Sequence, residues 1–169
     1  MSEDNSNVTA AEQPMQGDDA AAQSGSRYPA PFAVRMGDCN WHSLGDAFGL
    51  TQFGVNLETL QPGAQSALRH WHALSDEFVH ILSGELTLRT NAGEFVMRAG
   101  MCVGSKPGDK NAHHLVNRSA AAASFIVLGS RVAGDNAFYP DDDFACFHTE
   151  AGRRKVHKDG SAYVERPAV

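Results

Sequence analysis

Three histidines and one glutamate are the residues of this sequence whose types and spacing could do chemistry together. His70 and His72 lie two positions apart, Glu77 follows closely, and His113 comes about forty residues later. Residues i and i+2 of a β-strand project from the same face, with Cβ atoms about 6–7 Å apart. Two imidazole nitrogens at that separation can converge on one ion at about 2.0–2.2 Å from each. The spacing therefore predicts a coordination shell for one divalent transition metal.

The segments that must position these residues are typical of short β-strands. Residues 53–60 alternate along the chain, and further strands are expected at 67–72, 77–82, 85–90, 94–97, 101–104, 113–116 and 124–128. Turn signals separate them, such as Ser83-Gly84 and Asn91-Ala92-Gly93. Turns that recur about every ten residues, without a long helical period, predict an all-β sandwich or barrel.

The apolar neighbours of Glu77 and His113 indicate that both side chains face the inside of the fold. Glu77 shares a strand face with Val79. In the same way, His113 shares a face with Leu115. A carboxylate buried among apolar groups is costly unless it is paired or bound to a metal, so Glu77 is expected to be a ligand. His114 is the alternative to His113, and strand alternation places it on the opposite face.

Each of these histidines has an ordinary structural explanation when it is considered alone. A single histidine is more often a hydrogen-bonded core or surface residue than a ligand. With eight histidines in 169 residues, one His-x-His arises by chance with a probability of roughly 0.4. Requiring Glu77 and Gly84 at their spacing as well reduces that probability to well under about 1%. The prediction of a metal site therefore depends on the whole set.

The segment around these residues resembles the first signature motif of the cupin superfamily, small β-barrel proteins of the germin and RmlC-like kind. That motif is Gly, about five residues, His-x-His, about three or four residues, Glu, about six residues, Gly. Here six residues separate Gly63 from His70, and four separate His72 from Glu77. Six more separate Glu77 from Gly84. The first gap is one residue longer than in the family pattern.

A second family motif is matched in part further along the chain. It is Gly, about five residues, Pro-x-Gly, about two residues, His, about three residues, Asn. Here five residues follow Gly100 before Lys106-Pro107-Gly108, and four more precede His113. Lys106 takes the proline position, and the loop before the histidine is two residues longer than the pattern. His113 keeps its distance to Asn117, so the resemblance extends the ligand role to it.

The resemblance implies the fold and the domain organisation of the chain. It covers about residues 52–130 and implies a double-stranded β-helix, the jelly-roll barrel of the cupins. Residues 27–169 are expected to form a single cupin domain around that core. Residues 1–26 contain no aromatic side chain and few apolar ones, and such a segment cannot offset its ordering entropy by burial. A disordered N-terminal tail is therefore expected.

The resemblance also implies a cofactor. The expected metal ligands are His70, His72, Glu77 and His113. Three imidazoles and one carboxylate suit Fe(II), Mn(II), Ni(II), Co(II) or Zn(II), and the order of affinities does not select among them. The ion would keep one or two open positions, which permits Lewis-acid, hydroxide or oxygen chemistry.

Two classes of function remain open from the sequence. One is a metal-dependent enzyme, an isomerase or a dioxygenase, acting on a small sugar-like or carboxylate substrate. Some similar cupins are labelled sugar-phosphate isomerases. The other is a module that binds or senses a small molecule through the metal without turnover. A cupin transcription regulator is disfavoured, because the N-terminal segment lacks the apolar periodicity of a helix-turn-helix.

The composition excludes several other classes of protein. Hydrophobic residues make up 42% and charged residues 20% of the chain, which is ordinary for a globular domain. A net charge of -6 argues against a nucleic-acid or anionic-membrane surface. We expect no signal peptide and no membrane span. Three widely separated cysteines argue against a disulfide framework, so the expected location is the cytoplasm.

The face opposite to Glu77 predicts how the protein associates. Phe78, His80 and Leu82 give this outer face a partly apolar surface, which is typical of a homodimer contact. Arg69 is expected at the surface or in an interface rather than in a binding site. Residues 134–169 show no clear period and are expected to pack around the barrel or a neighbouring subunit.

Overall fold

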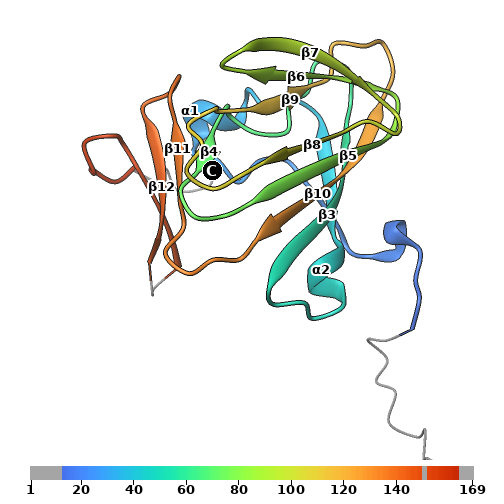
Figure 1. The fold of residues 1–169 in the computed structure, drawn as a ribbon, viewed down its shortest axis with the longest axis horizontal. Helices are drawn as coiled ribbons and strands as arrows, with labels where there is room; N and C mark the ends of the chain where they lie inside the picture. Colours follow the sequence, from blue (N-terminus) through green and yellow to red (C-terminus); the bar gives the residue numbers. More distant parts are fainter. Residues whose placement is uncertain (1–12, 150–151, 164–169) are drawn as a thin grey trace, which may run out of the picture.

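The computed structural model describes residues 13–149 and 152–163. Antiparallel strands wrap into a barrel, with short helices at its edge (Figure 1). The prediction of an all-β fold is therefore confirmed. Within the described residues, no helix is long and apolar enough to cross a membrane.

The larger sheet has the strand order β1-β2-β3-β10-β5-β8. Its strands are β1 (Ala22–Ser24), β2 (Cys39–Ser43), β3 (Phe53–Leu60), β10 (Ala123–Ser130), β5 (Glu77–Ser83) and β8 (Cys102–Ser105). β10 pairs with β3 on one side and β5 on the other, so Ile126 lies beside both Leu57 and His80. Glu77 opens β5, where it faces Ser105 of β8.

The remaining strands form two smaller sheets that meet at the histidines. One has the order β7-β6-β9 and the other β13-β12-β11-β4. Their strands are β4 (Trp71–His72), β6 (Glu85–Thr90), β7 (Gly93–Arg98), β9 (His114–Val116), β11 (Asn136–Tyr139), β12 (Phe144–Thr149) and β13 (Gly152–Val156). An antiparallel bridge between His70 and His113 joins the residue before β4 to the residue before β9.

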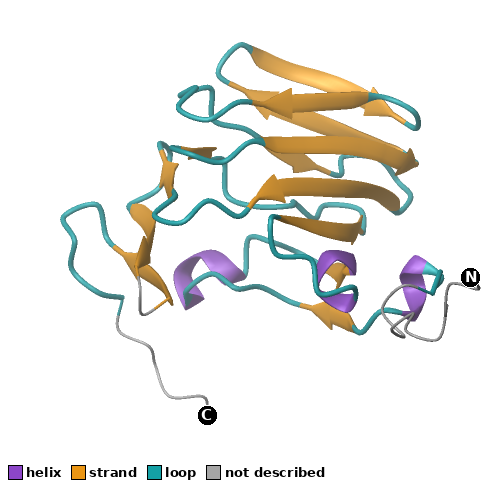
Figure 2. Cartoon of the chain, turned by 60° about the horizontal axis from the view of Figure 1, so that its bottom comes forward, coloured by secondary structure: helices purple, strands orange, loops and turns teal. Residues whose placement is uncertain are grey.

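The short helices lie along one side of the strands (Figure 2). They are η2 (Gly17–Asp19), α1 (Ala30–Ala33) and α2 (Leu44–Ala47). All three lie within residues 17–47, where they alternate with β1 and β2 of the larger sheet.

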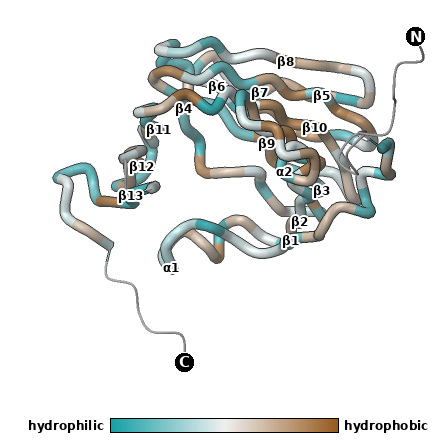
Figure 3. Tube along the Cα trace, turned by 90° about the horizontal axis from the view of Figure 1, so that it is seen from below, coloured by the Kyte–Doolittle hydropathy of each residue, from teal (hydrophilic) through white to brown (hydrophobic). Residues whose placement is uncertain are grey.

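Two buried clusters hold the molecule together. The barrel cluster is mostly aliphatic and consists of Leu60, Ala64, Val79, Ile81, Leu86, Leu88, Met97, Leu115, Ala123 and Phe125. The end cluster is partly aromatic and consists of Met36, Leu68, Ala137, Tyr139, Phe144 and Cys146. Figure 3 shows the hydrophobic residues gathered along β5 and β10. Each large side chain buried in these clusters contributes about 1.5–3 kcal/mol.

Most expected strands agree with the structure, and one differs in an informative way. The strands at 53–60 and 85–90 have the predicted bounds. The expected strand at 67–72 is regular only at Trp71–His72. Leu68 is fully buried in the end cluster, and its N–H donates to the Tyr28 hydroxyl at 3.3 Å. This local packing takes the place of regular strand pairing in the residues before His70.

The N-terminal segment is ordered earlier than its composition predicts. Residues 17–24 contain η2 and β1, whereas residues 1–12 lie outside the described residues. A Cβ added to Gly17 would lie 3.3 Å from the Leu57 side chain, so the segment packs beside Leu57 of β3. His42 Nδ1 donates to the Ala20 carbonyl at 2.7 Å and ties the segment to β2. Ordered structure therefore begins before the predicted tail boundary at residue 26.

The C-terminal segment forms strands that the sequence pattern does not predict. β11 pairs with β4, placing Ala137 beside His72 and Phe138 beside Trp71. The rings of Trp71 and Phe138 stack with centroids 4.6 Å apart. The segment therefore packs on the barrel's own edge, which was one of the two expected arrangements, and helps to fix the position of His72.

The two glycines of the first motif give a paired stability prediction. Gly84 has a φ of 74°, and an added Cβ would lie 2.8 Å from both the Ala122 oxygen and the Ala123 Cβ. Gly63 has a φ of 86° but open space around it. Gly84→Ala is expected to lower the free energy of unfolding by about 2–4 kcal/mol, and Gly63→Ala by about 1 kcal/mol. Urea denaturation measures both, and equal losses would contradict the close-contact explanation.

Candidate metal centre

The four predicted residues come from three parts of the barrel. His70 and His72 flank Trp71 at β4, Glu77 opens β5, and His113 precedes β9. The His70 and His113 backbones exchange two hydrogen bonds, with N···O distances of 3.1 and 2.8 Å. This bridge places their imidazole rings 5.5 Å apart, centroid to centroid. Chain segments separated by about forty residues are therefore locked together at the site.

The side chains of these residues converge on one point. The candidate ligand atoms of His70, His72 and Glu77 all lie within 4.8 Å of one another. Glu77 Oε1 lies 2.8 Å from His113 Nε2, and Glu77 Oε2 lies 3.9 Å from His72 Nε2. Atoms that bind one ion at about 2.0–2.2 Å must be roughly 3–4 Å apart. The ligand atoms of His70, His72 and Glu77 therefore form a group that could hold one ion, and His113 lies against Glu77 at the edge of that group.

Hydrogen bonds at Nδ1 set the orientation of each imidazole. His70 Nδ1 donates to the Leu68 carbonyl at 2.8 Å, and His72 Nδ1 donates to Asp135 Oδ2 at 2.7 Å. His113 Nδ1 lies 3.2 Å from Ser105 Oγ. Because a proton on Nδ1 leaves the lone pair on Nε2, the contacts of His70 and His72 leave two basic Nε2 nitrogens, whereas His113 Nε2 donates to Glu77 Oε1.

The charges at the centre favour an ionised Glu77. Burial opposes ionisation, but the hydrogen bond from His113 and the nearby imidazoles lower the pKa of Glu77 to about 2. For His113, burial opposes protonation, yet the contact with Glu77 raises its pKa above the usual value. Burial lowers the pKa of His70 to about 4, so its imidazole is neutral at neutral pH. An anionic carboxylate beside a neutral imidazole is the form in which both groups bind metals.

Asp135 supports the centre and is not predicted by the sequence, where it lies in a Gly-Asp-Asn turn. Its side chain is almost fully buried, and its Oδ1 accepts the Leu74 N–H at 2.8 Å while Oδ2 accepts from His72. Burial opposes ionisation, but these hydrogen bonds lower the pKa of Asp135. Only the pairing of β11 with β4 brings this turn to His72, so no local signal could have found it.

An amide at position 135 should weaken metal binding. Asp135→Asn would leave either the His72 Nδ1–H or the Leu74 N–H facing an NH₂ group, because both carboxylate oxygens are used. We expect a loss of about 10–100-fold in metal affinity, measured by competition with a chelator. Asp143→Asn is the matched control, since Asp143 pairs with His157 at the surface. Equal affinities of the two variants would refute the supporting role.

Comparison with known proteins identifies the family. The chain is 40% identical to a sugar phosphate isomerase of the cupin superfamily, from Silicibacter pomeroyi, whose crystal structure is known. The alignment covers 90% of this chain and 97% of that one, with a TM-score of 0.85. Residues 56–129 also match the family model described as Cupin domain. The chain belongs to the cupin superfamily.

Other relatives of this cupin share less of its sequence. A candidate sugar phosphate isomerase from Acidithiobacillus ferrooxidans is 27% identical over 76% of this chain and 82% of that one, with a TM-score of 0.67. A predicted oxalate decarboxylase from Thermotoga maritima is 17% identical over 71% of this chain and 100% of that one, with a TM-score of 0.58, which shows the fold alone. No curated protein matches the chain. The predicted double-stranded β-helix is confirmed by the family.

The structure also places His114 and Arg69, two residues beside the centre whose positions were predicted from the sequence. His114 lies next to His113, and its Nδ1 donates to the Ala67 carbonyl at 2.9 Å rather than contacting Glu77. Arg69 is half-buried, with its side chain 12% exposed. It binds Asp141 through two hydrogen bonds of 2.6 and 2.7 Å, and it donates to the Ala112 carbonyl. Arg69 thus holds the backbone just before His113.

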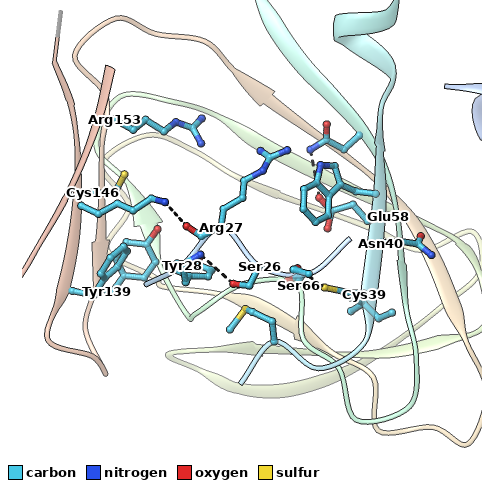
Figure 4. A pocket seen from close by; sticks show the side chains of 17 residues that line it. Ser26, Arg27, Tyr28, Cys39, Asn40, Glu58, Ser66, Tyr139, Cys146 and Arg153 are labelled. Atoms are coloured by element: carbon cyan, nitrogen blue, oxygen red, sulfur yellow. Dashed lines mark hydrogen bonds between the residues drawn. The ribbon is translucent and has the colours of Figure 1, made fainter. Parts of the chain in front are cut away.

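One cavity of this cupin reaches the centre, and a second cavity shares part of its lining. The inner cavity, of about 90 Å³, is lined by His70, Glu77 and His113. The outer cavity, of about 200 Å³, lies between the N-terminal segment and the C-terminal strands and is seen in Figure 4. Glu58 and Ser66 line both cavities. A small molecule is therefore the size of ligand that the site can take.

Proposed function

We propose that this cupin is a metal-dependent isomerase acting on a small sugar phosphate. In this proposal one divalent transition metal is held by His70, His72, Glu77 and His113. The observation that carries it is the grouping of the His70, His72 and Glu77 ligand atoms, with His113 Nε2 against the same carboxylate and an acceptor near each Nδ1. The sugar phosphate isomerase of Silicibacter pomeroyi, similar over nearly its whole length, supports the reaction class.

The metal would supply one part of the chemistry, the polarisation of a substrate carbonyl oxygen. Interconversion of an aldose and a ketose also moves a proton between neighbouring carbon atoms. That transfer needs a base that is near the substrate and is not itself a ligand. Glu77 is engaged with His113 and His72, so another side chain must act as the base.

Glu58 is the carboxyl that meets this need. It lies on β3, on the wall that the two cavities share. Burial raises its pKa to about 7, the neighbouring Glu77 acts in the same direction, and Asn56 and Arg27 act against them. A carboxyl whose pKa lies near the working pH can both accept and return a proton. We therefore assign Glu58 the proton-transfer step.

The proposal is tested by assaying the full chain against a panel of aldose and ketose phosphates. Metal-free protein is compared with protein loaded with Mn, Fe, Co, Ni or Zn, and hydrogen exchange from D₂O into the sugar is followed by NMR. We expect metal-dependent interconversion with exchange at the carbon that loses its proton. Metal-dependent binding without turnover would instead favour the sensing module. Oxygen uptake by the Fe(II) form would favour a dioxygenase.

The outer face of β5 supports the homodimer expected from the sequence. Phe78 and Leu82 are 42% and 44% exposed on this face. Large apolar side chains are rarely left together in water without a partner. We propose that this face joins two copies of the chain, and light scattering on the purified protein should give twice the mass of the chain.

A further inference from the structure

The outer cavity of this cupin is lined by an unusual concentration of positive charge. Arg27, Arg153 and Lys155 all line it, although the chain as a whole has a net charge of -6. Within residues 13–149 and 152–163, none of the three cations has a carboxylate within salt-bridge distance, whereas Arg35, Arg69, Arg98, Arg118 and Arg131 do. The cavity therefore has cationic groups to offer a ligand.

The two arginines come from parts of the fold that border the cavity on different sides. Arg27 lies over the Trp41 ring, 4.5 Å from its centroid, and donates to Gln23 Oε1 at 3.1 Å. Arg153 lies on β13, and its side chain extends from the opposite wall into the same space as Arg27 (Figure 4). Lys155 donates to the Arg27 carbonyl, which links the two walls. The fold thus brings two distant arginines to one cavity.

The position of this cavity relative to the metal centre suits one extended small molecule. Tyr139 lines the outer cavity, and its ring stacks on His70 with centroids 5.4 Å apart. Glu58 lies on the wall that the two cavities share. A molecule with its carbonyl at the four predicted ligands would pass Glu58 and place its other end near the arginines.

We propose that Arg27 and Arg153 form the subsite for the phosphate group of the substrate, an inference that rests on the proposed function. Two guanidinium groups offer planar pairs of N–H donors, which match phosphate oxygens in geometry and charge. Neither arginine touches the candidate ligands among the contacts of the described residues, so the subsite positions the substrate and takes no part in metal binding. The cation–π contact with Trp41 reduces the ordering cost for Arg27.

The test is the binding of inorganic phosphate to the metal-free full chain, measured by ³¹P NMR titration. Without a metal, phosphate has no ion to bind at the centre. We expect Arg27→Gln and Arg153→Gln each to weaken phosphate binding by at least about tenfold. Arg154→Gln is the matched control and should stay within about twofold, because Arg154 donates to the Gly160 carbonyl on the neighbouring turn.

Each outcome decides the assignment separately from the isomerase proposal. Absent phosphate binding, or unchanged binding in both arginine variants, would overturn the subsite. Acetate binding as tightly as phosphate would overturn it in favour of a carboxylate site. A loss confined to Arg27→Gln and Arg153→Gln would support it. Because the titration uses neither metal nor turnover, its result stands whether or not the isomerase assay succeeds.

Discussion

Replacing His72 or Glu77 by alanine is expected to remove nearly all bound metal from this cupin. Wild-type protein should purify or reconstitute with about one equivalent of a divalent transition metal, and each variant with less than about a tenth. The loss should be large because Glu77 contacts both His113 and His72 around the common point. Elemental analysis after gel filtration in metal-free buffer measures the content.

His80→Ala is the matched control for these variants. His80 lies on the same strand as Glu77 but outside the group of candidate ligands, so its metal content should equal that of the wild type. Adding metal should raise the melting temperature of the wild type and of His80→Ala, but not of the other two. This second measurement separates loss of the site from loss of folding. Full metal content in His72→Ala and Glu77→Ala would disprove the ligand set.

Glu58→Gln should abolish most turnover and leave the metal in place. Removing a proton-transfer group typically lowers kcat about 10²–10⁴-fold. The wild-type rate should rise as the pH increases through about 7, the pKa of Glu58, because the base must be ionised to accept a proton. Glu94→Gln, which alters a carboxylate paired with Arg118 at the surface, should retain wild-type activity. Full activity in Glu58→Gln would assign the proton transfer to another group.

The same variant has an effect on stability that needs no substrate. The folded state raises the pKa of Glu58 from 4.5 to about 7, so the stabilising contribution is present below about pH 4.5 and is lost as the pH rises through about 7. Glu77, Arg27 and Cys39 are the titratable groups that interact with it. At pH 8, the free energy of unfolding of Glu58→Gln should therefore exceed that of the wild type by about 2 kcal/mol, a value reduced to allow for water in the cavity. At pH 4 the difference should vanish.

The residues that the sequence could predict are those whose spacing is local. His70 and His72 share a strand face, and Glu77 begins the strand that follows, so the order of the chain already places them near one another. His113 required the family motif, because its bridge to His70 spans about forty residues. The strands at 53–60 and 85–90 were predictable for the same local reason, since alternation fixes each one by itself.

The residues that the sequence could not predict depend on long-range pairing. Asp135 reaches His72 only because β11 pairs with β4. Arg27 and Arg153 meet only because the N-terminal segment and β13 line the same cavity. Glu58 lies on the face of β3 that lines the cavities, whereas Leu57 on the opposite face lies beside Gly17. The alternation of residues along one strand does not indicate which of its two faces a distant segment will pack against.

The most direct test of the metal centre is anomalous diffraction from crystals of the metal-loaded cupin, recorded on both sides of the metal's absorption edge. We predict one strong peak, about 2.0–2.2 Å from the Nε2 atoms of His70, His72 and His113 and from a carboxylate oxygen of Glu77. A peak bound elsewhere in the molecule, or the absence of any peak among these four side chains, would contradict the account.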